Sequence, residues 1–454
     1  MSAHEGAGPK GLAQHLIHLA VLLLLFALLY AGTRGVPDMH GPAATIAAAG
    51  FLLLAGTLAS ELVEPLGLPH LSGYILAGVV AGPHVLHLVD HHAVEELSRV
   101  NALALALIAL AGGSQLRLEM LRRGLRSIST HHVLQLALVL PLMAGVFYAA
   151  RPLVPFAAGL PGAAALGVAL LWGVFSMCRS SAATLGILAQ TRANGPVAQH
   201  SLAFVMTSDV LAIVLTACVI AVARPMIVPG GSMSRDDLEV LGRVLLGSVA
   251  LGTTLGLLLA AYLRLVGRQL VLVFVALGFG ATEVLRYLQF NPLLVFMVAG
   301  FVVMNLSRQG DKLIQAVQDA ASVVFVLFFA TTGAHLDLPQ LARMWPVALL
   351  LGASRAVASA GAARLAGRLA ADAPVLQRWS WAPLVSQAGL ALGLGMEMQR
   401  AFPGLGSGFG ALVVACVGLN ELVGPILFKL ALDRSGESAA EASRASMLST
   451  EEGA

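Results

Sequence analysis

The sequence predicts an all-α polytopic membrane protein with about 13–14 transmembrane helices, and three observations lead to this fold class. Of the 454 residues, 58% are hydrophobic and only 11% are charged, whereas a soluble domain carries about 25% charged residues. Apolar runs of about 20 residues, each long enough to cross a hydrocarbon layer of about 30 Å, recur along the whole chain. These runs lack the apolar–polar alternation of the short strands in a transmembrane β-barrel.

The first apolar run, Leu16 to Tyr30, is long for a signal peptide, and no small-residue cleavage site follows it before Arg34. We therefore expect a retained helix there. The complete set of about fourteen candidate spans lies at 15–32, 43–63, 69–88, 100–116, 132–150, 162–190, 196–223, 240–263, 269–288, 291–306, 320–336, 344–363, 380–399 and 406–431.

Three regions follow from these spans. Residues 1–42 form an N-terminal segment with an extra transmembrane helix, and residues 43–432 form the transmembrane domain. The tail at 433–454 is rich in Ser, Ala and Glu, which predicts a short disordered segment.

Basic residues in the loops orient the chain. If the N-terminus is cytoplasmic, the cytoplasmic loops carry clusters of basic residues and the opposite loops mostly single arginines. The positive-inside rule then places both termini in the cytoplasm. The clustered residues are Arg117, Arg122, Arg123, Arg126, Arg192, Arg264, Arg268, Arg308, Lys312, Arg364, Arg368 and Arg378.

Several functional classes lack their usual signals. Cys178, Cys218 and Cys416 lie within predicted spans without metal-binding spacing, so we interpret them as small packing residues. No Walker-type phosphate loop occurs, which argues against an ATP-driven pump. The net charge of +3 reflects basic loops rather than a nucleic-acid surface. We predict no enzyme activity, no cofactor and no nucleic-acid partner.

The two halves of the chain carry a weak internal echo. Gly-Tyr-Ile-Leu-Ala-Gly at 73–78 is matched by Val-Phe-Met-Val-Ala-Gly at 295–300. At a similar distance after each, the pattern Gly-x-x-Leu-x-Leu-x-x-Leu appears, at 113–121 and at 333–341. The echoed spans are an odd number of helices apart, so the copies cross the membrane in opposite directions. Such inverted repeats place the transport site of many secondary transporters near the midplane; chance matching among abundant small residues is the alternative.

Two spans are interrupted at corresponding positions of the halves. The span at 162–190 meets Cys-Arg-Ser-Ser at 178–181, and the span at 380–399 contains Val-Ser-Gln-Ala-Gly at 385–389. Hydroxyls, an amide and glycine can replace backbone hydrogen bonds where a helix unwinds. We therefore predict two broken helices, with Ser386, Gln387 and Gly389 at the second break.

Asp209 is the only formal charge between Val197 and Val222. A carboxylate at bilayer depth costs about 2.5–3.5 kcal/mol on insertion scales, so such residues usually mark an ion or proton path. Oxygen ligands suit small hard cations. The neutral oxygens that can join Asp209 in binding a cation or proton are those of Ser208, Ser180, Ser181 and Thr184. The alternative for Asp209 is a structural ion pair with a nearby arginine.

The chain resembles the cation:proton antiporter superfamily, and within it the second, largely bacterial branch of sodium/hydrogen exchanger-like proteins. The resemblance covers about residues 43–432 and rests on the order and spacing of several short motifs. These are Pro-His-Leu-Ser-Gly-Tyr-Ile-Leu-Ala-Gly-Val-Val-Ala-Gly-Pro at 69–83, Ser180-Ser181, Asp209, Phe-Phe-Ala-Thr-Thr-Gly-Ala-His-Leu-Asp-Leu at 328–338, and Pro425.

The resemblance implies a thirteen-helix exchanger core in a bacterial inner membrane, with two crossed, broken helices, and it implies a homodimer. It also implies that Asp209 alternately binds a proton and a monovalent cation. The sequence departs from the family pattern at Ser208, at Ala182 and at Gln387-Ala388-Gly389-Leu390, where many members have an Arg-Gly-Glu-like element.

Three further charges fall within spans. The resemblance places a basic residue of the core near Arg355, where it can pair with acids; a structural counter-ion is the alternative. Arg179 can take the same role or neutralise helix ends at the crossing. Glu421 can pair with Arg355 or Arg179, or carry a second proton.

The histidines of the chain indicate a functional site less strongly than these charged residues do. A cluster at a predicted outer boundary contains His84, His87, Asp90, His91 and His92. It has three possible interpretations: a metal site, a pH-responsive surface or a plain interfacial loop. His200 lies within about two helical turns of Asp209, so it can modulate protonation or pack as a neutral side chain. We expect no metal beyond a transported monovalent cation.

The sequence therefore predicts a secondary antiporter that exchanges protons for Na⁺ or K⁺, with both ions competing for Asp209. Two alternatives remain open at this stage. A channel or ion-sensing membrane protein is suggested by the absent Arg-Gly-Glu-like element, and a small organic anion transporter by Arg179 beside helix N-termini.

Overall fold

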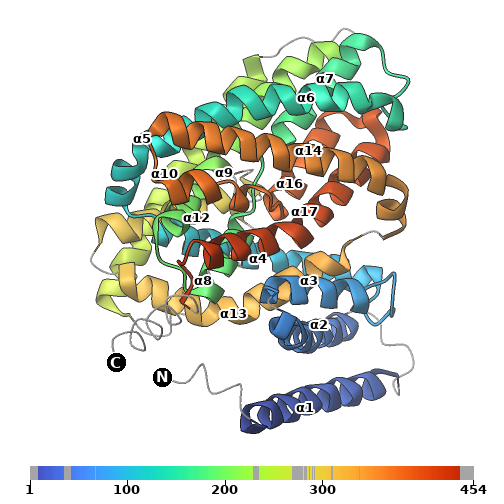
Figure 1. Ribbon diagram of the computed structural model, residues 1–454, viewed down its shortest axis with the longest axis vertical. Coiled ribbons are helices and arrows are strands. Elements are labelled where there is room, and N and C mark those ends of the chain that lie inside the picture. Colours follow the sequence, from blue (N-terminus) through green and yellow to red (C-terminus); the bar gives the residue numbers. More distant parts are fainter. Residues whose placement is uncertain are drawn as a thin grey trace. The chain divides into compact units, whose positions relative to one another are not determined.

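The computed structural model describes residues 9–34, 42–66, 68–228, 235–267, 292–307, 310–336 and 338–439, with isolated positions between 273 and 290 (Figure 1). Every regular element in these ranges is a helix. The predicted span at 269–288 lies almost entirely outside the described residues. By length and composition, six described helical segments can cross a membrane, namely Ala43–Leu66, Leu118–Leu153, Pro196–Ile227, Gly242–Leu265, Leu341–Ala370 and Gly408–Arg434. The predicted all-helical membrane fold is confirmed.

The described residues divide into two compact units. The first holds residues up to Asn101 together with Ser322–Leu336. Its helices are α1 (Pro9–Arg34), α2 (Pro42–Val63), η1 (Glu64–Leu66), α3 (His70–Ala81), the start of α4 (His91–Gln115) and the end of α13 (Gly310–Ala334).

The second unit contains the other described elements. Within it, α14 lies along α5 and α6 (Figure 1). Its elements are α5 (Leu118–Leu134), η2 (Gln135–Val139), α6 (Leu140–Ala150), η3 (Arg151–Leu153), α7 (Gly162–Phe175), α8 (Ser181–Thr191), α9 (Pro196–Ile227), α10 (Arg235–Leu265), α12 (Pro292–Leu306), α14 (Leu338–Ala370), α15 (Pro374–Trp379), η4 (Ala382–Leu384), α16 (Gly389–Ala401), η5 (Pro403–Leu405) and α17 (Gly406–Arg434), with the end of α4 and the start of α13.

An aromatic core fixes the second unit around α7. Trp172 stacks on Phe147 of α6 with ring centroids 5.3 Å apart, and it also contacts Phe175 at 4.8 Å. Phe409 of α17 meets the same indole edge-on at 6.3 Å. All four side chains are buried, so α6, α7 and α17 share one well-packed core.

Close glycine contacts support the internal repeat. In the first unit, a Cβ on Gly78 would overlap the carbonyl oxygen of Ala330, and one on Gly333 would overlap that of Ile75. In the second unit, Gly113 stands in the same relation to Met297. The first motif of each copy thus packs against the second motif of the other copy, at crossings that only glycine permits.

The equivalent ends of the two copies also share a hydrogen bond. The N–H of Leu116 donates to the carbonyl of Gly113 at 3.1 Å, and the N–H of Leu336 donates to that of Gly333 at 3.1 Å. The Gly-x-x-Leu pattern therefore ends both helices in the same way.

Both predicted helix breaks are present. The first lies between Phe175, the last residue of α7, and Ser181, the first residue of α8. The second lies between Leu384, the end of η4, and Gly389, the start of α16. Ser180 caps α8, because its hydroxyl oxygen accepts the N–H of Ala183 at 3.0 Å.

Two expectations need correction. Arg122, Arg123 and Arg126 were expected in a loop but lie on the exposed face of α5, whose opposite face buries Ile128. One amphipathic helix accounts for both faces.

The chain is also ordered past 432, where the tail was expected to begin. Helix α17 runs to Arg434, and the Glu437 carboxylate accepts the N–H groups of Val197 and Ala198, each at 2.8 Å. These N–H groups open α9 and have no helical partners of their own, which a carboxylate satisfies. Residues 440–454 lie outside the described ranges.

Candidate functional site

Arg355 of α14 joins the two helix breaks. It is 2% exposed, and its Nε donates to the Ser176 carbonyl at 2.9 Å. Its two terminal nitrogens donate to the carbonyls of Cys178 at 2.7 Å, Leu384 at 2.9 Å and Val385 at 2.7 Å. A fixed cation thus satisfies carbonyls left without helical partners and opposes the negative ends of α7 and η4.

A chain of amides adds a second connection. The Gln387 side-chain nitrogen donates to the Phe175 carbonyl at 3.1 Å, and Asn420 of α17 donates to the Gln387 side-chain oxygen at 2.8 Å. Gly424 lets α17 approach the backbone of Ser386, because a Cβ there would lie 2.5 Å from the Ser386 Cα. The predicted crossover residues are therefore brought together, with Gly389 opening α16 beside them.

Arg179 neutralises the end of α7. It is 1% exposed, and one terminal nitrogen donates to the carbonyls of Ser176 at 2.7 Å and Cys178 at 3.0 Å. The other donates to the side-chain oxygen of Gln135 at 3.0 Å. Gln135 begins the π-helical turn η2, a feature often found at functional sites. Sequence reasoning missed Gln135, although an amide inside the apolar run at 132–150 was a usable signal.

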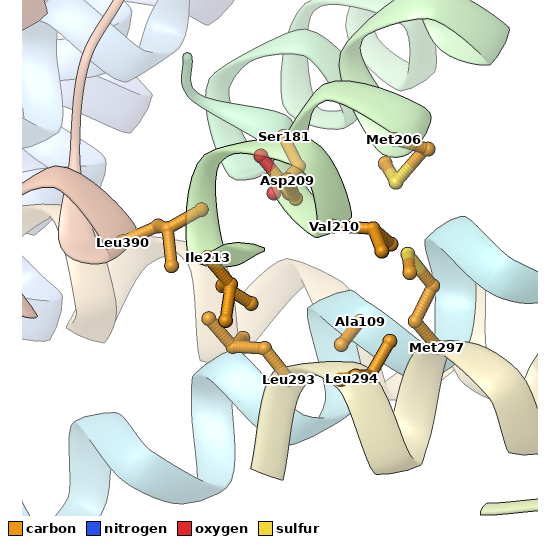
Figure 2. Close-up of a pocket in the computed structure, with 10 residues that line it drawn as sticks. All are labelled: Ala109, Ser181, Met206, Asp209, Val210, Ile213, Leu293, Leu294, Met297 and Leu390. Carbon is orange, nitrogen blue, oxygen red and sulfur yellow. The ribbon is translucent and has the colours of Figure 1, made fainter. Parts of the chain in front are cut away.

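Asp209 of α9 is buried, with 8% of the residue exposed. Among the described residues its Oδ1 has no hydrogen-bond partner and its carboxylate forms no ion pair. Ser181, the first residue of α8, lies directly beside the carboxyl (Figure 2). The structural ion pair that was the alternative for Asp209 is thus not formed with Arg179 or any other described residue.

Asp209 and Ser181 open into a small pocket with otherwise apolar walls (Figure 2). Its wall comes from four helices of the second unit besides the start of α8. The remaining lining residues are Ala109 of α4, Met206, Val210 and Ile213 of α9, Leu293, Leu294 and Met297 of α12, and Leu390 of α16.

The other predicted oxygen ligands are placed elsewhere. Ser208 donates to the Phe204 carbonyl at 2.7 Å and lines a separate pocket with Arg179. Thr184 donates to the Ser180 carbonyl at 2.9 Å. The structure therefore places one neutral hydroxyl, that of Ser181, in the pocket of Asp209.

Glu421 does not pair with either arginine. It is 1% exposed, and its Oε1 has no hydrogen-bond partner among the described residues. Arg355 and Arg179 instead bind backbone carbonyls. Of the two alternatives for Glu421, the ion pair with Arg355 or Arg179 is not formed, because the carbonyls freed at the breaks take the donors of both arginines.

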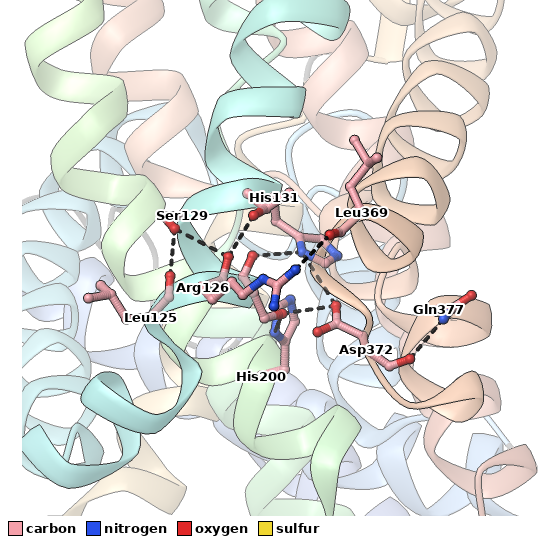
Figure 3. A network of polar contacts seen from close by, with 10 residues as sticks. Leu125, Arg126, Ser129, His131, His200, Leu369, Asp372 and Gln377 are labelled. Atoms are coloured by element: carbon pink, nitrogen blue, oxygen red, sulfur yellow. Dashed lines mark hydrogen bonds and ion pairs between the residues drawn. The ribbon is translucent and has the colours of Figure 1, made fainter.

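His200 belongs to a polar network at the start of α9 (Figure 3). Its ring lies 4.5 Å from that of His131, centroid to centroid, and its Nδ1 lies 3.3 Å from the Ser127 hydroxyl. That hydroxyl donates to the Asp372 carboxylate at 2.9 Å. His200 is thus a packed histidine that ties α9 to α5 and to the turn after α14.

Within the cluster of His84, His87, Asp90, His91 and His92, the rings of His84 and His91 lie 5.2 Å apart, centroid to centroid. Among the residues that the structure describes, no group of three or more His, Cys, Asp or Glu is arranged to hold a metal ion.

Comparisons with known proteins agree with this geometry. A family model described as the transmembrane sodium/hydrogen exchanger matches residues 49–403. The chain is also similar to the iron transporter MagA of Paramagnetospirillum magneticum, with 26% identity over 306 residues. That match covers 66% of this chain and 65% of the length of the relative.

The fold is similar to solved structures of the sodium proton antiporter MjNhaP1 from Methanocaldococcus jannaschii. The structure at pH 8 gives a TM-score of 0.63 with 18% identity, covering 86% of this chain and 96% of that one. An electron-microscopy map gives 0.66 with 16% identity, covering 87% and 96%. The predicted antiporter-like fold is confirmed.

Proposed function

The chain belongs to the transmembrane sodium/hydrogen exchanger family, and we propose that it is a secondary antiporter exchanging protons for Na⁺ or K⁺ across a bacterial inner membrane. The observation that carries this proposal is Asp209. Its carboxylate is buried without an ion-pair partner among the described residues, and it shares a pocket with Ser181. An uncompensated acid at this depth is typical of an ion or proton path.

Competition at one carboxylate gives the mechanism. A proton or a cation on Asp209 removes the bare charge that opposes movement through the apolar surroundings, so only the occupied carrier changes sides. Because the empty carrier pays about 2.5–3.5 kcal/mol for an exposed carboxylate in the membrane, its movement is slower by roughly two orders of magnitude. That difference enforces exchange.

The two arginines keep the remaining charge fixed. Arg355 and Arg179 bind backbone carbonyls and therefore serve as permanent counter-charges for the helix ends. With a single titrating acid in the pocket, we propose a one-to-one, electroneutral exchange. Reversal-potential measurements that detect net charge movement would contradict this stoichiometry.

The proposal also concerns which kind of ion is exchanged for the proton. The Asp209 carboxylate and the Ser181 hydroxyl offer oxygen atoms, which hard cations prefer as ligands. We extend the proposal to a homodimer with both termini in the cytoplasm, as the family resemblance and the loop charges suggest.

A proteoliposome assay tests the proposal. Internal pH is followed after external addition of Na⁺, K⁺, Li⁺ or choline, with an Fe²⁺ arm because one relative is named an iron transporter. We expect Na⁺ or K⁺ to change internal pH, and Asp209→Asn to abolish the change. Thr254→Ala, which removes an exposed hydroxyl of α10, is the matched control and keeps activity.

Two results separate the alternatives. A cation-triggered pH change that survives Asp209→Asn refutes competition at this carboxylate. Organic-anion uptake that survives Asp209→Asn, with no pH change on addition of a cation, favours the organic anion transporter. Cation flux without any proton movement favours a channel on the same fold.

A further inference from the structure

An open cavity lies beside the start of α9, and we call it the vestibule. Its volume is about 660 Å³. The residues of the vestibule used below are Gln115, Gln199 and Ala203; His200 and Asp372 line it as well. This vestibule and the pocket of Asp209 are separate, and all residues lining both belong to the second unit.

Helix α4 passes both spaces on one face. Gln115 lines the vestibule and Ala109 lines the pocket of Asp209. Gly112 lies midway, three residues from each, and such spacing keeps the three positions on one side of a helix. Along α4, Gly112 is therefore about one helical turn from the residue that lines the vestibule and about one turn from the residue that lines the pocket.

Helix α9 repeats this order. Ala203 lines the vestibule and Asp209 lines its own pocket. Met206 lies midway, again three residues from each, and it also lines the pocket (Figure 2). Both helices thus place one residue between the vestibule and the pocket.

These two middle residues touch each other. A Cβ on Gly112 would lie 2.6 Å from the terminal methyl carbon of Met206 and 2.7 Å from its sulfur. Met206 is 1% exposed. The thioether therefore fills the space that the absent side chain of Gly112 leaves, at the middle position of both helices.

We propose that Met206 is the gate between the vestibule and the pocket of Asp209, closed in this structure by its contact with Gly112. A methionine suits this role because its unbranched side chain has three rotatable bonds and can leave the gap without a shift of either helix. Met297 lines the same side of the pocket (Figure 2) and provides an apolar surface for the displaced side chain. The role in transport rests on the proposed function; the barrier itself does not.

Thiol accessibility tests the barrier without any transport assay. Cys178, Cys218 and Cys416 are replaced by Ala, and one new cysteine is introduced at Val210, in the pocket, or at Gln199, an exposed residue of the vestibule. Each protein is labelled with a quaternary-ammonium methanethiosulfonate, whose charge restricts it to aqueous paths. Size-exclusion profiles confirm that the variants fold.

With Met206 present, we expect Gln199→Cys to react quickly and Val210→Cys slowly. Met206→Ala should raise the labelling rate of Val210→Cys at least tenfold, whereas Met206→Leu, which keeps the volume, should not. The rate at Gln199→Cys should stay constant in all backgrounds. Equal labelling of Val210→Cys with Met206 and with Met206→Ala overturns the proposal, as does a parallel rise at Gln199→Cys.

A double-mutant cycle covers the case in which the cysteine-free protein does not fold. Gly112→Ala places a methyl group against the Met206 thioether, so it should slow exchange at least fivefold with Met206 present and have no effect beside Met206→Ala. Independent, multiplicative effects overturn the gate. If Asp209→Asn keeps exchange while the labelling result holds, the proposed function fails and the barrier stands.

Discussion

Arg355 is the residue whose loss should damage the two helix breaks most. Four carbonyl oxygens accept hydrogen bonds from it. Those of Ser176 and Cys178 also accept from Arg179. The Leu384 and Val385 carbonyls depend on Arg355 alone among the described residues, so Arg355→Met leaves these two without a donor.

The magnitude follows from those two carbonyls. A buried acceptor left unpaired costs about 1–3 kcal/mol, so two of them cost about 2–6 kcal/mol. That is a large part of the stability of about 5–15 kcal/mol that is usual for a folded domain. Arg355→Lys should recover only part of it, because an ammonium is a point charge and cannot reproduce the planar fork of donors.

Thermal unfolding in detergent, followed by fluorescence-detected size exclusion, measures this effect. We expect Arg355→Met to lower Tm by at least about 5 °C, with Arg355→Lys in between. Arg364→Met, an exposed arginine two and a half turns further along α14, is the control and should leave Tm unchanged. If Arg355→Met unfolds at the temperature of Arg364→Met, the carbonyls do not depend on this side chain.

Three further outcomes are expected. Gly78→Ala should lower Tm by an amount equivalent to about 1–3 kcal/mol, because its Cβ meets the backbone carbonyl of Ala330, while Gly145→Ala, in open space, should not; equal Tm values would contradict the close crossing. Glu437→Gln should weaken the cap of α9 by about 1 kcal/mol, seen as faster hydrogen exchange at the start of α9; unchanged exchange there would rule out the cap. Glu421→Gln should keep Tm, because the buried carboxyl has no cationic partner among the described residues, whereas Glu421→Lys should lower it; a large loss with Gln would reveal a hidden partner.

The two helix breaks could be predicted from the sequence because polar side chains inside an apolar span are costly in a membrane unless they satisfy backbone groups or bind ions. Cys178-Arg179-Ser180-Ser181 and Val385 to Gly389 stand out against their neighbours for this reason, and both mark helix ends. Asp209 was found in the same way. The predicted internal repeat agrees with the glycine contacts, because the close helix crossings at Gly78, Gly113 and Gly333 leave no room for a Cβ.

The partners of these residues could not be predicted. Arg355 could pair with acids or act as a structural counter-ion, and the sequence did not predict that it binds the carbonyls of both breaks, because the positions of those carbonyls depend on where the helices break in space. For Arg179, the structure agrees with the alternative in which it neutralises helix ends at the crossing. The roles of Gln135 and Asn420 at the helix breaks were not predicted, because an uncharged amide inside an apolar span is a weaker signal than a formal charge. Met206 reads as one more apolar residue, and its place between two spaces depends on the packing of α9 against α4.

The most direct test of the account is the pH dependence of the apparent cation affinity in proteoliposomes. If a proton and a cation compete for Asp209, the apparent KM for Na⁺ or K⁺ should rise as pH falls, by about tenfold per pH unit once the site is mostly protonated, while the maximal rate stays constant. An apparent KM that is independent of pH, with a maximal rate that falls instead, would show that the two ions do not share this carboxylate.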